Sequence, residues 1–138
     1  MRVLGIDYGS ARVGVALGDT ETHIASPWAV ISGSDRLELL RKIHEIATNE
    51  HAEAIVVGIP KPLKNREEEN DQVKEIRSFI ADLAAQGLTI HEEDETLSSS
   101  LAAQQVRAAG EKGKRDDLAA ANILQTWLDR KGMQDDRR

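Results

Sequence analysis

The sequence has 138 residues, a length typical of one domain, and its 40% hydrophobic content excludes a disordered or fibrous chain. The 18 Lys and Arg against 24 Asp and Glu give a net charge of −6, which argues against a protein that coats nucleic acid through bulk positive charge. Cysteine is absent, which excludes disulfides and zinc–thiolate sites, and no apolar run suggests a signal peptide or membrane span, so we expect a cytoplasmic protein.

Three short strands are predicted at the start of the sequence. Residues 3–7 form an apolar run that ends at Asp7, residues 13–17 alternate between apolar and small or polar side chains, and residues 24–31 form a third strand. Pro27 places this third strand at an edge, or marks its start. Because short turns separate the three strands, we expect an antiparallel meander.

Helices and strands alternate in the middle of the chain. A helix is predicted from Ser34 or Asp35, then a strand over residues 54–60 that is buried on both faces, and then a helix that opens with the acidic residues 67–69. The expected buried positions are Leu37, Leu40, Ile43, His44 and Ala47 in the first helix and Val73, Ile76, Ile80 and Leu83 in the second. The second helix is expected to end at Gly87.

A further strand starts at Leu88 and runs into four acidic residues, 92–95. Helices are predicted over residues 98–109 and 116–130, joined by a Gly/Lys loop, with Ala120, Leu124, Trp127 and Leu128 facing inward. We expect one domain over residues 1–131 and a disordered tail over residues 132–138. The fold class is therefore α/β, a mixed five-stranded sheet with helices on its faces.

Asp7 is the first candidate for chemistry, because it ends a strand that should be central, with Gly9 two residues on. A carboxylate at the end of a buried strand costs free energy unless it is paired or binds a metal ion. The alternative is that Asp7 only organises a hairpin turn, since Asp-x-Gly turns are common.

Two acidic clusters are the other candidates. The run at residues 92–95 lies where α/β sheets place their sites, and alternation carries Glu93 and Glu95 to one face and the other two acids to the opposite face. The pair at residues 116–117 follows Lys112, Lys114 and Arg115. Most such runs are a solvated rim or a helix cap, and the residues alone do not select one acid from either cluster.

Three carboxylates from separate elements would form a site of hard oxygen donors, which favours Mg²⁺ or Mn²⁺. Two such ions activate water and stabilise the leaving oxygen of a phosphodiester. Basic loops at Lys61, Lys64 and Arg66 and at residues 112–115 would frame such a site with positive charge.

Four segments, in order, resemble those of the YqgF/RuvX family, Holliday-junction-resolvase-like proteins regarded as pre-16S rRNA nucleases. The residues over 7–16 are similar to the family's opening Asp-x-Gly-x-x-x-x-Gly-x-Ala, Gly58-Ile59-Pro60 to its Gly-Leu-Pro, and residues 94–98 to its Asp-Glu-Arg-Leu-Ser/Thr. Residues 112–124 are similar to its Lys-rich loop, Asp and Ala-rich helix.

This resemblance implies an RNase H-like fold and metal-ligand, catalytic carboxylates at Asp7, Glu95 and Asp116. It implies that Lys114 faces the substrate backbone, and we add Lys112, Arg115 and Lys61 as substrate-binding residues. Two departures concern the same region: Thr96 stands where the family has Arg, and the loop after Pro60 lacks the usual Asp-Gly turn.

The expected activity is therefore metal-dependent endonucleolytic hydrolysis, in 5′-end maturation of pre-16S rRNA, with RNA favoured over DNA because of the resemblance alone. Ribosomal precursor particles are expected partners, a membrane is not, and the chain is expected to be a monomer or homodimer. Three alternatives remain: a resolvase of branched DNA, a non-catalytic nucleic-acid or transcription-associated module, and a sugar-kinase-type phosphotransferase. A phosphotransferase needs a second similar domain, for which 138 residues leave no room.

Overall fold

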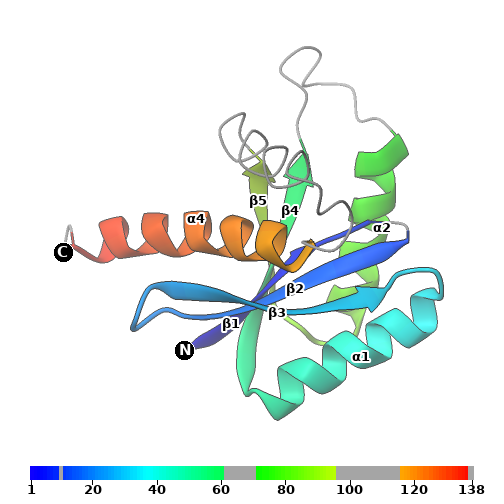
Figure 1. Ribbon diagram of the computed structural model, residues 1–138, viewed down its shortest axis with the longest axis horizontal. Coiled ribbons are helices and arrows are strands. Elements are labelled where there is room, and N and C mark those ends of the chain that lie inside the picture. The colour runs from blue at the N-terminus through cyan, green and yellow to red at the C-terminus, as the bar shows by residue number, and fades with distance from the viewer. Residues whose placement is uncertain (10, 61–70, 96–115, 137–138) are drawn as a thin grey trace.

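The computed structural model describes residues 1–9, 11–60, 71–95 and 116–136. Its elements follow the predicted order and are shown in Figure 1. They are β1 (Arg2–Asp7), β2 (Arg12–Asp19), β3 (Ile24–Ser32), α1 (Arg36–Asn49), β4 (Ala52–Pro60), α2 (Asp71–Ala85), β5 (Ile90–Glu95) and α4 (Asp116–Asp136). The helix expected over residues 98–109 and the acidic turn at 67–69 lie outside the described residues.

The strands form one five-stranded sheet in the order β3-β2-β1-β4-β5. β1, β2 and β3 pair antiparallel, as the meander predicts, whereas β4 pairs parallel with both β1 and β5. The predicted mixed sheet is confirmed, with β1 at its centre and the Pro27-containing strand at an edge. Because β1, β4 and β5 are parallel, their carboxyl ends lie at the same end of the sheet.

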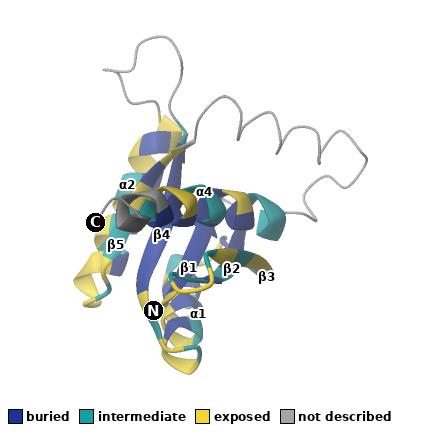
Figure 2. Cartoon of the chain, turned by 90° about the vertical axis from the view of Figure 1, so that its left-hand side faces the viewer, coloured by how far each residue is buried: buried dark blue, intermediate teal, exposed yellow. Residues whose placement is uncertain are grey.

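Helices cover both faces of the sheet. On one face, α1 and α2 pack on an apolar cluster that includes Leu4, Ile6 and Val57. On the other, α4 packs on Val3, Ala16 and Val56 through the four positions expected to face inward, Ala120, Leu124, Trp127 and Leu128. Residues 54–59 of β4 are buried throughout, and Figure 2 shows the buried positions between the helices.

The buried stripe of α1 differs from the expected one. Leu39, Leu40, Ile43 and Ala47 are buried, whereas His44 is exposed and Leu37 is 80% exposed. The buried side of α1 therefore lies closer to Leu39 than predicted, and Leu37 and His44 lie outside it. The periodicity of the sequence alone permits both choices, because Leu occupies three positions on neighbouring sides of this helix.

The last helix is longer than expected. It passes Arg130 and continues to Asp136, so residues 132–136, which we expected in a frayed tail, are helical. Gly132 lies against His23 of the β2–β3 turn, and a Cβ at this position would be 3.2 Å from the imidazole. The contact with His23 therefore accounts for a glycine inside the helix. No helix within the described residues is long and apolar enough to cross a membrane.

Candidate active site

Asp7 ends β1 on the face of the sheet that α4 covers. Leu4, Ile6 and Tyr8 belong to the opposite cluster, so the alternation of the strand brings Val3, Gly5 and Asp7 to the α4 face. In the β1–β2 pairing Asp7 lies opposite Gly14.

Asp116 is brought to the same corner by a close approach of α4 to β2. A Cβ built on Gly14 would lie 1.9 Å from the carbonyl oxygen of Asp116 and 2.9 Å from the nitrogen of Asp117. Only glycine leaves room for the first turn of the helix at this position. Asp7 is the register partner of Gly14, so the carboxyl end of β1 and the first turn of α4 lie close together here. The two segments are far apart in the sequence.

The two acids of the 116–117 pair make different contacts. The Asp116 carboxylate is only 14% exposed and lies 3.2 Å from Nε of Arg12, the first residue of β2. Oδ1 of Asp117 instead accepts a hydrogen bond from the backbone nitrogen of Leu118, at 3.0 Å. Asp117 thus serves the first turn of the helix, whereas Asp116 is available to a site shared with β1 and β2.

Glu95 is the last residue of β5 and lies opposite Pro60 of β4. β4 separates β5 from β1, so the main chain at Glu95 is on the order of 10 Å from β1. Lys61, Lys112, Lys114, Arg115 and Thr96 lie outside the described residues.

The donor set fits a hard divalent cation. Asp7 and Asp116 offer carboxylate oxygens on one side of the sheet, the ligands that Mg²⁺ and Mn²⁺ prefer. Within the part of the chain that the structure describes, no three acidic or imidazole side chains come together closely enough to hold a metal ion. At the level of the main chain, Asp7 and Asp116 therefore start from the same corner of the sheet, on either side of Gly14.

Glu93 is a buried acid whose role the sequence did not reveal. It is 4% exposed and forms an ion pair with Arg130 of α4, so the prediction that it faces away from Glu92 is confirmed. Burial, opposed by Arg130 and assisted by Asp94, raises the pKa of its carboxyl. Nothing in the spacing of residues 93 and 130 indicates this pair.

Tyr8 anchors the end of β1 on the opposite face. Its ring stacks on Phe79 of α2, with centroids 4.6 Å apart. Its hydroxyl donates to Glu75 and accepts from Arg36, both at 3.1 Å, so that the three elements α1, β1 and α2 meet at this residue. The residue that follows Asp7 is therefore fixed by packing and hydrogen bonds.

A family model described as "RuvX: Holliday junction resolvase" matches residues 1–130. A protein of Maridesulfovibrio salexigens named "Putative pre-16S rRNA nuclease" is 37% identical over 94% of this chain and 99% of its own length. A protein of the same name from a Sulfurihydrogenibium species is 36% identical over 94% of this chain and 90% of its own. The resemblance inferred from four short motifs is thereby confirmed.

Solved structures share the fold at low sequence identity. RuvC of Thermus thermophilus in complex with a Holliday junction substrate matches with a TM-score of 0.60 and 18% identity, covering 96% of each chain. The fowlpox virus resolvase in complex with Holliday junction DNA matches with a TM-score of 0.53 and 14% identity, covering 94% of this chain and 98% of its own. These similarities confirm the RNase H-like fold class.

Proposed function

Because the chain belongs to the RuvX family, we propose that it is a divalent-metal-dependent nuclease that hydrolyses phosphodiester bonds. The observation that carries the proposal is the meeting of β1 and α4 at Gly14, which brings Asp7 and Asp116 to one corner of the sheet. Two carboxylates from separate elements can bind a divalent cation. A metal-dependent nuclease uses such a cation to act on the phosphodiester.

Asp7, Asp116 and Glu95 are the residues we assign to the metal. When bound, Mg²⁺ or Mn²⁺ supplies an activated water and neutralises charge at the leaving oxygen. Asp7 is held rigidly by the central strand, and Tyr8 beyond it is locked in place by Phe79. Arg12 balances the charge of the Asp116 carboxylate and keeps it in place. Lys114, Lys112, Arg115 and Lys61 are proposed to contact the substrate backbone.

The proposed substrate is precursor 16S rRNA, processed at its 5′ end in the cytoplasm. The names of the relatives that are 36–37% identical support this choice. The second candidate is a branched DNA junction, which is favoured by the description of the family and by the bound substrates of the two structural neighbours.

Cleavage assays with purified protein test both substrates. Structured RNA that spans the 5′ end of 16S rRNA and a four-way DNA junction are incubated with Mg²⁺, with EDTA as the metal-free control. Asp7→Asn, Glu95→Gln and Asp116→Asn are expected to lower the cleavage rate at least about 100-fold, because each removes charge from a metal ligand.

Asp117→Asn is the matched control. It removes the same charge one residue away and keeps an oxygen that accepts from Leu118, so its cleavage rate should stay near that of the wild type. Equal residual cleavage by the wild type and all the variants would indicate a contaminating nuclease and would refute the enzymatic proposal, leaving the non-catalytic module. Cleavage of the DNA junction alone would select the second substrate.

A further inference from the structure

A polar pocket lies on the same face of the sheet as Asp7 and Asp116. It is lined by His91 of β5 and by Trp127, Arg130 and Lys131 of α4. His91 and Glu95 belong to the same strand, four residues apart, so the pocket and the carboxyl end of β5 are separated by about 13 Å. The pocket therefore lies on the same face of the sheet as the Asp7–Asp116 corner, about four turns further along α4.

The described residues that line the pocket carry more positive than negative charge, although the whole chain has a net charge of −6. Arg130 and Lys131 each contribute one positive charge, and Glu93 beneath them contributes one negative charge. The nearby Asp129 accepts a hydrogen bond from Gln125, one turn earlier in the same helix. Lys131 lines the pocket, and its ammonium lies over the Trp127 ring, which is itself part of the wall; this placement of positive charge favours an anion.

The walls of the pocket are held in place before any ligand binds. The rings of His91 and Trp127 are 5.2 Å apart, and the ammonium of Lys131 lies 5.4 Å from the centre of the Trp127 ring. Trp127 is only 4% exposed, so its ring supports the pocket and does not offer a free face for stacking a base. The recognition elements that face a ligand are therefore cationic and polar groups.

The size of the pocket also favours a small anionic group. Its volume is about 210 Å³. Pockets that enclose a whole small molecule typically have about 300–1,000 Å³. A single phosphate group fits this size better than a base with its sugar.

We propose that the His91–Trp127–Arg130–Lys131 pocket binds a backbone phosphate of the nucleic-acid substrate, away from the bond that is cleaved. This inference rests on the proposed nuclease function. Along α4, Arg130 lies 14 residues from Asp116, about 21 Å. At about 3.4 Å of helix axis per phosphate along one strand, this corresponds to about six nucleotides of a duplex. The pocket thus fixes the register of the substrate on the protein and does not take part in the chemistry.

Binding assays with a cleavage-deficient protein test the pocket. In an Asp7→Asn background, Kd for a labelled RNA stem is measured by fluorescence anisotropy between about 0.05 and 0.3 M salt. One phosphate contact contributes a slope of about 0.9 to the dependence of log K on log salt, which corresponds to about fivefold in Kd at 0.15 M. Lys131→Ala should weaken binding by that factor and reduce the slope by about one, and His91→Ala should also weaken binding.

Three variants control for charge and fold. Lys131→Arg should restore the affinity and the slope, because it keeps the positive charge. Lys74→Ala removes one positive charge from α2, on the opposite face of the sheet, and should change neither. Arg130 is left intact, since its loss would leave Glu93 buried without its partner. In the cleavage-competent protein, Lys131→Ala should raise KM and leave kcat unchanged.

The outcomes separate this inference from the proposed function. If the wild type cleaves and binds nucleic acid while Lys131→Ala and His91→Ala leave Kd and the salt slope unchanged, the pocket is not a phosphate site and the nuclease function stands. If Lys74→Ala weakens binding as much as Lys131→Ala, the effect is one of net charge and the pocket is refuted. If the wild type neither binds nor cleaves any of the substrates, both proposals fail.

Discussion

The position of α4 against β2 depends on Gly14. In Gly14→Ala the added methyl group would lie 1.9 Å from the Asp116 carbonyl oxygen, and the first turn of the helix would have to move away from β2. We expect a loss of about 3 kcal/mol in the free energy of unfolding, measured by urea denaturation. Cleavage should fall further than the unfolded fraction explains, because Asp116 moves with the turn.

Gly87→Ala is the matched control, because it makes the same substitution at a glycine with no close neighbour. No atom lies within 4 Å of the new Cβ, and the cost arises from the positive φ of 87° at this residue. It should destabilise the protein by about 1 kcal/mol and leave the cleavage rate of the folded protein unchanged. A Gly14→Ala protein with normal stability and activity would contradict the close contact between α4 and β2.

Glu93 gives the folded protein a pH-dependent stability. Because its pKa is raised in the folded state, the folded protein takes up this proton at a higher pH than the unfolded chain does. The contribution of Glu93 to stability is therefore gained as pH falls from the raised pKa toward the unfolded value near 4.5, and lost as pH rises through the same window.

Relative to the wild type, the free energy of unfolding of Glu93→Gln should be highest at neutral pH. It should fall as the pH decreases, because the wild type then gains stability by protonating Glu93. Arg130, which loses its partner in this variant, is 58% exposed and stays hydrated. Unfolding free energies from urea titrations at pH 7 and near pH 5 measure the difference. Glu92→Gln, at an exposed neighbour paired with Arg77, controls for the loss of a carboxylate. A difference between wild type and Glu93→Gln that does not change with pH would contradict the prediction.

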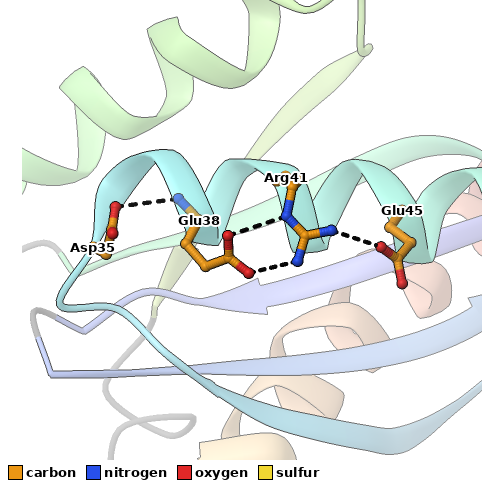
Figure 3. Close-up of polar contacts among 4 residues, drawn as sticks. All are labelled: Asp35, Glu38, Arg41 and Glu45. Carbon is orange, nitrogen blue, oxygen red and sulfur yellow. Dashed lines mark hydrogen bonds and ion pairs between the residues drawn. The ribbon is translucent and has the colours of Figure 1, made fainter.

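At the scale of single elements, the start of α1 depends on one capping side chain. Asp35 has extended backbone angles, φ −115° and ψ 107°, and its Oδ1 accepts from the backbone nitrogen of Glu38 at 3.2 Å (Figure 3). Asp35→Ala should destabilise the protein by about 1 kcal/mol, because a backbone N–H loses its partner. Thermal unfolding followed by circular dichroism at 222 nm measures the loss.

Arg41→Ala is the comparison within the same helix. Arg41 pairs with Glu38 and Glu45 along the exposed side of α1, as Figure 3 shows, but pairs in contact with water contribute little. Its effect on thermal stability should be clearly smaller than that of Asp35→Ala, and should shrink further at high salt. An equal or larger effect would mean that the ion pairs, and not the cap, hold the start of the helix.

The elements were largely predictable because local signals agree with the tertiary structure. Residues 54–60 are continuously apolar, as a strand buried on two faces requires, and Asp35 precedes its helix as a cap. The structure differs from the predicted elements where local sequence signals are ambiguous. Three leucines allow two stripes on α1. Gly132 suggests a helix end, whereas the helix continues to Asp136 and Gly132 lies close to His23.

The sequence indicates which acidic residues are candidates for the site, but it does not indicate how they are placed in space or which residues pair with them. Strand ends and the family motif indicate Asp7, Asp116 and Glu95, and the main chain of the first two lies close to Gly14. The partners Arg12 and Arg130 could not be inferred, because their ion pairs depend on how α4 crosses the sheet and no periodicity encodes that crossing. Short motifs therefore indicate candidate ligands, whereas tertiary packing determines what balances their charge.

At the scale of the whole molecule, the net charge of −6 makes nucleic-acid binding conditional on metal. Without divalent ions the site repels a phosphate backbone, so the wild type should bind RNA more weakly than about 1 μM at 0.15 M salt, close to ordinary non-specific affinities. Adding Mg²⁺ should tighten binding, and the increase should be smaller in Asp7→Asn, which carries one negative charge fewer at the site.

Anisotropy titrations with Ca²⁺, which allow binding without cleavage to be tested, and with EDTA measure this difference. Asp117→Asn changes the net charge equally and should retain the metal dependence of the wild type. A metal-free complex tighter than micromolar, or an equal response to metal in Asp7→Asn, would contradict this account of the charge balance.

If Asp7 and Asp116 form the site as proposed, the meeting of β1 and α4 at Gly14 also has a consequence for the protein during its own synthesis. Asp7 leaves the ribosome early, in the central strand, while Asp116 follows only after the rest of the sheet has been translated. A nascent chain that has already formed its sheet still lacks half of the corner. On the proposed function, an unfinished copy is a harmless one, and a newly made nuclease cannot cut RNA near the translating ribosome until α4 has docked.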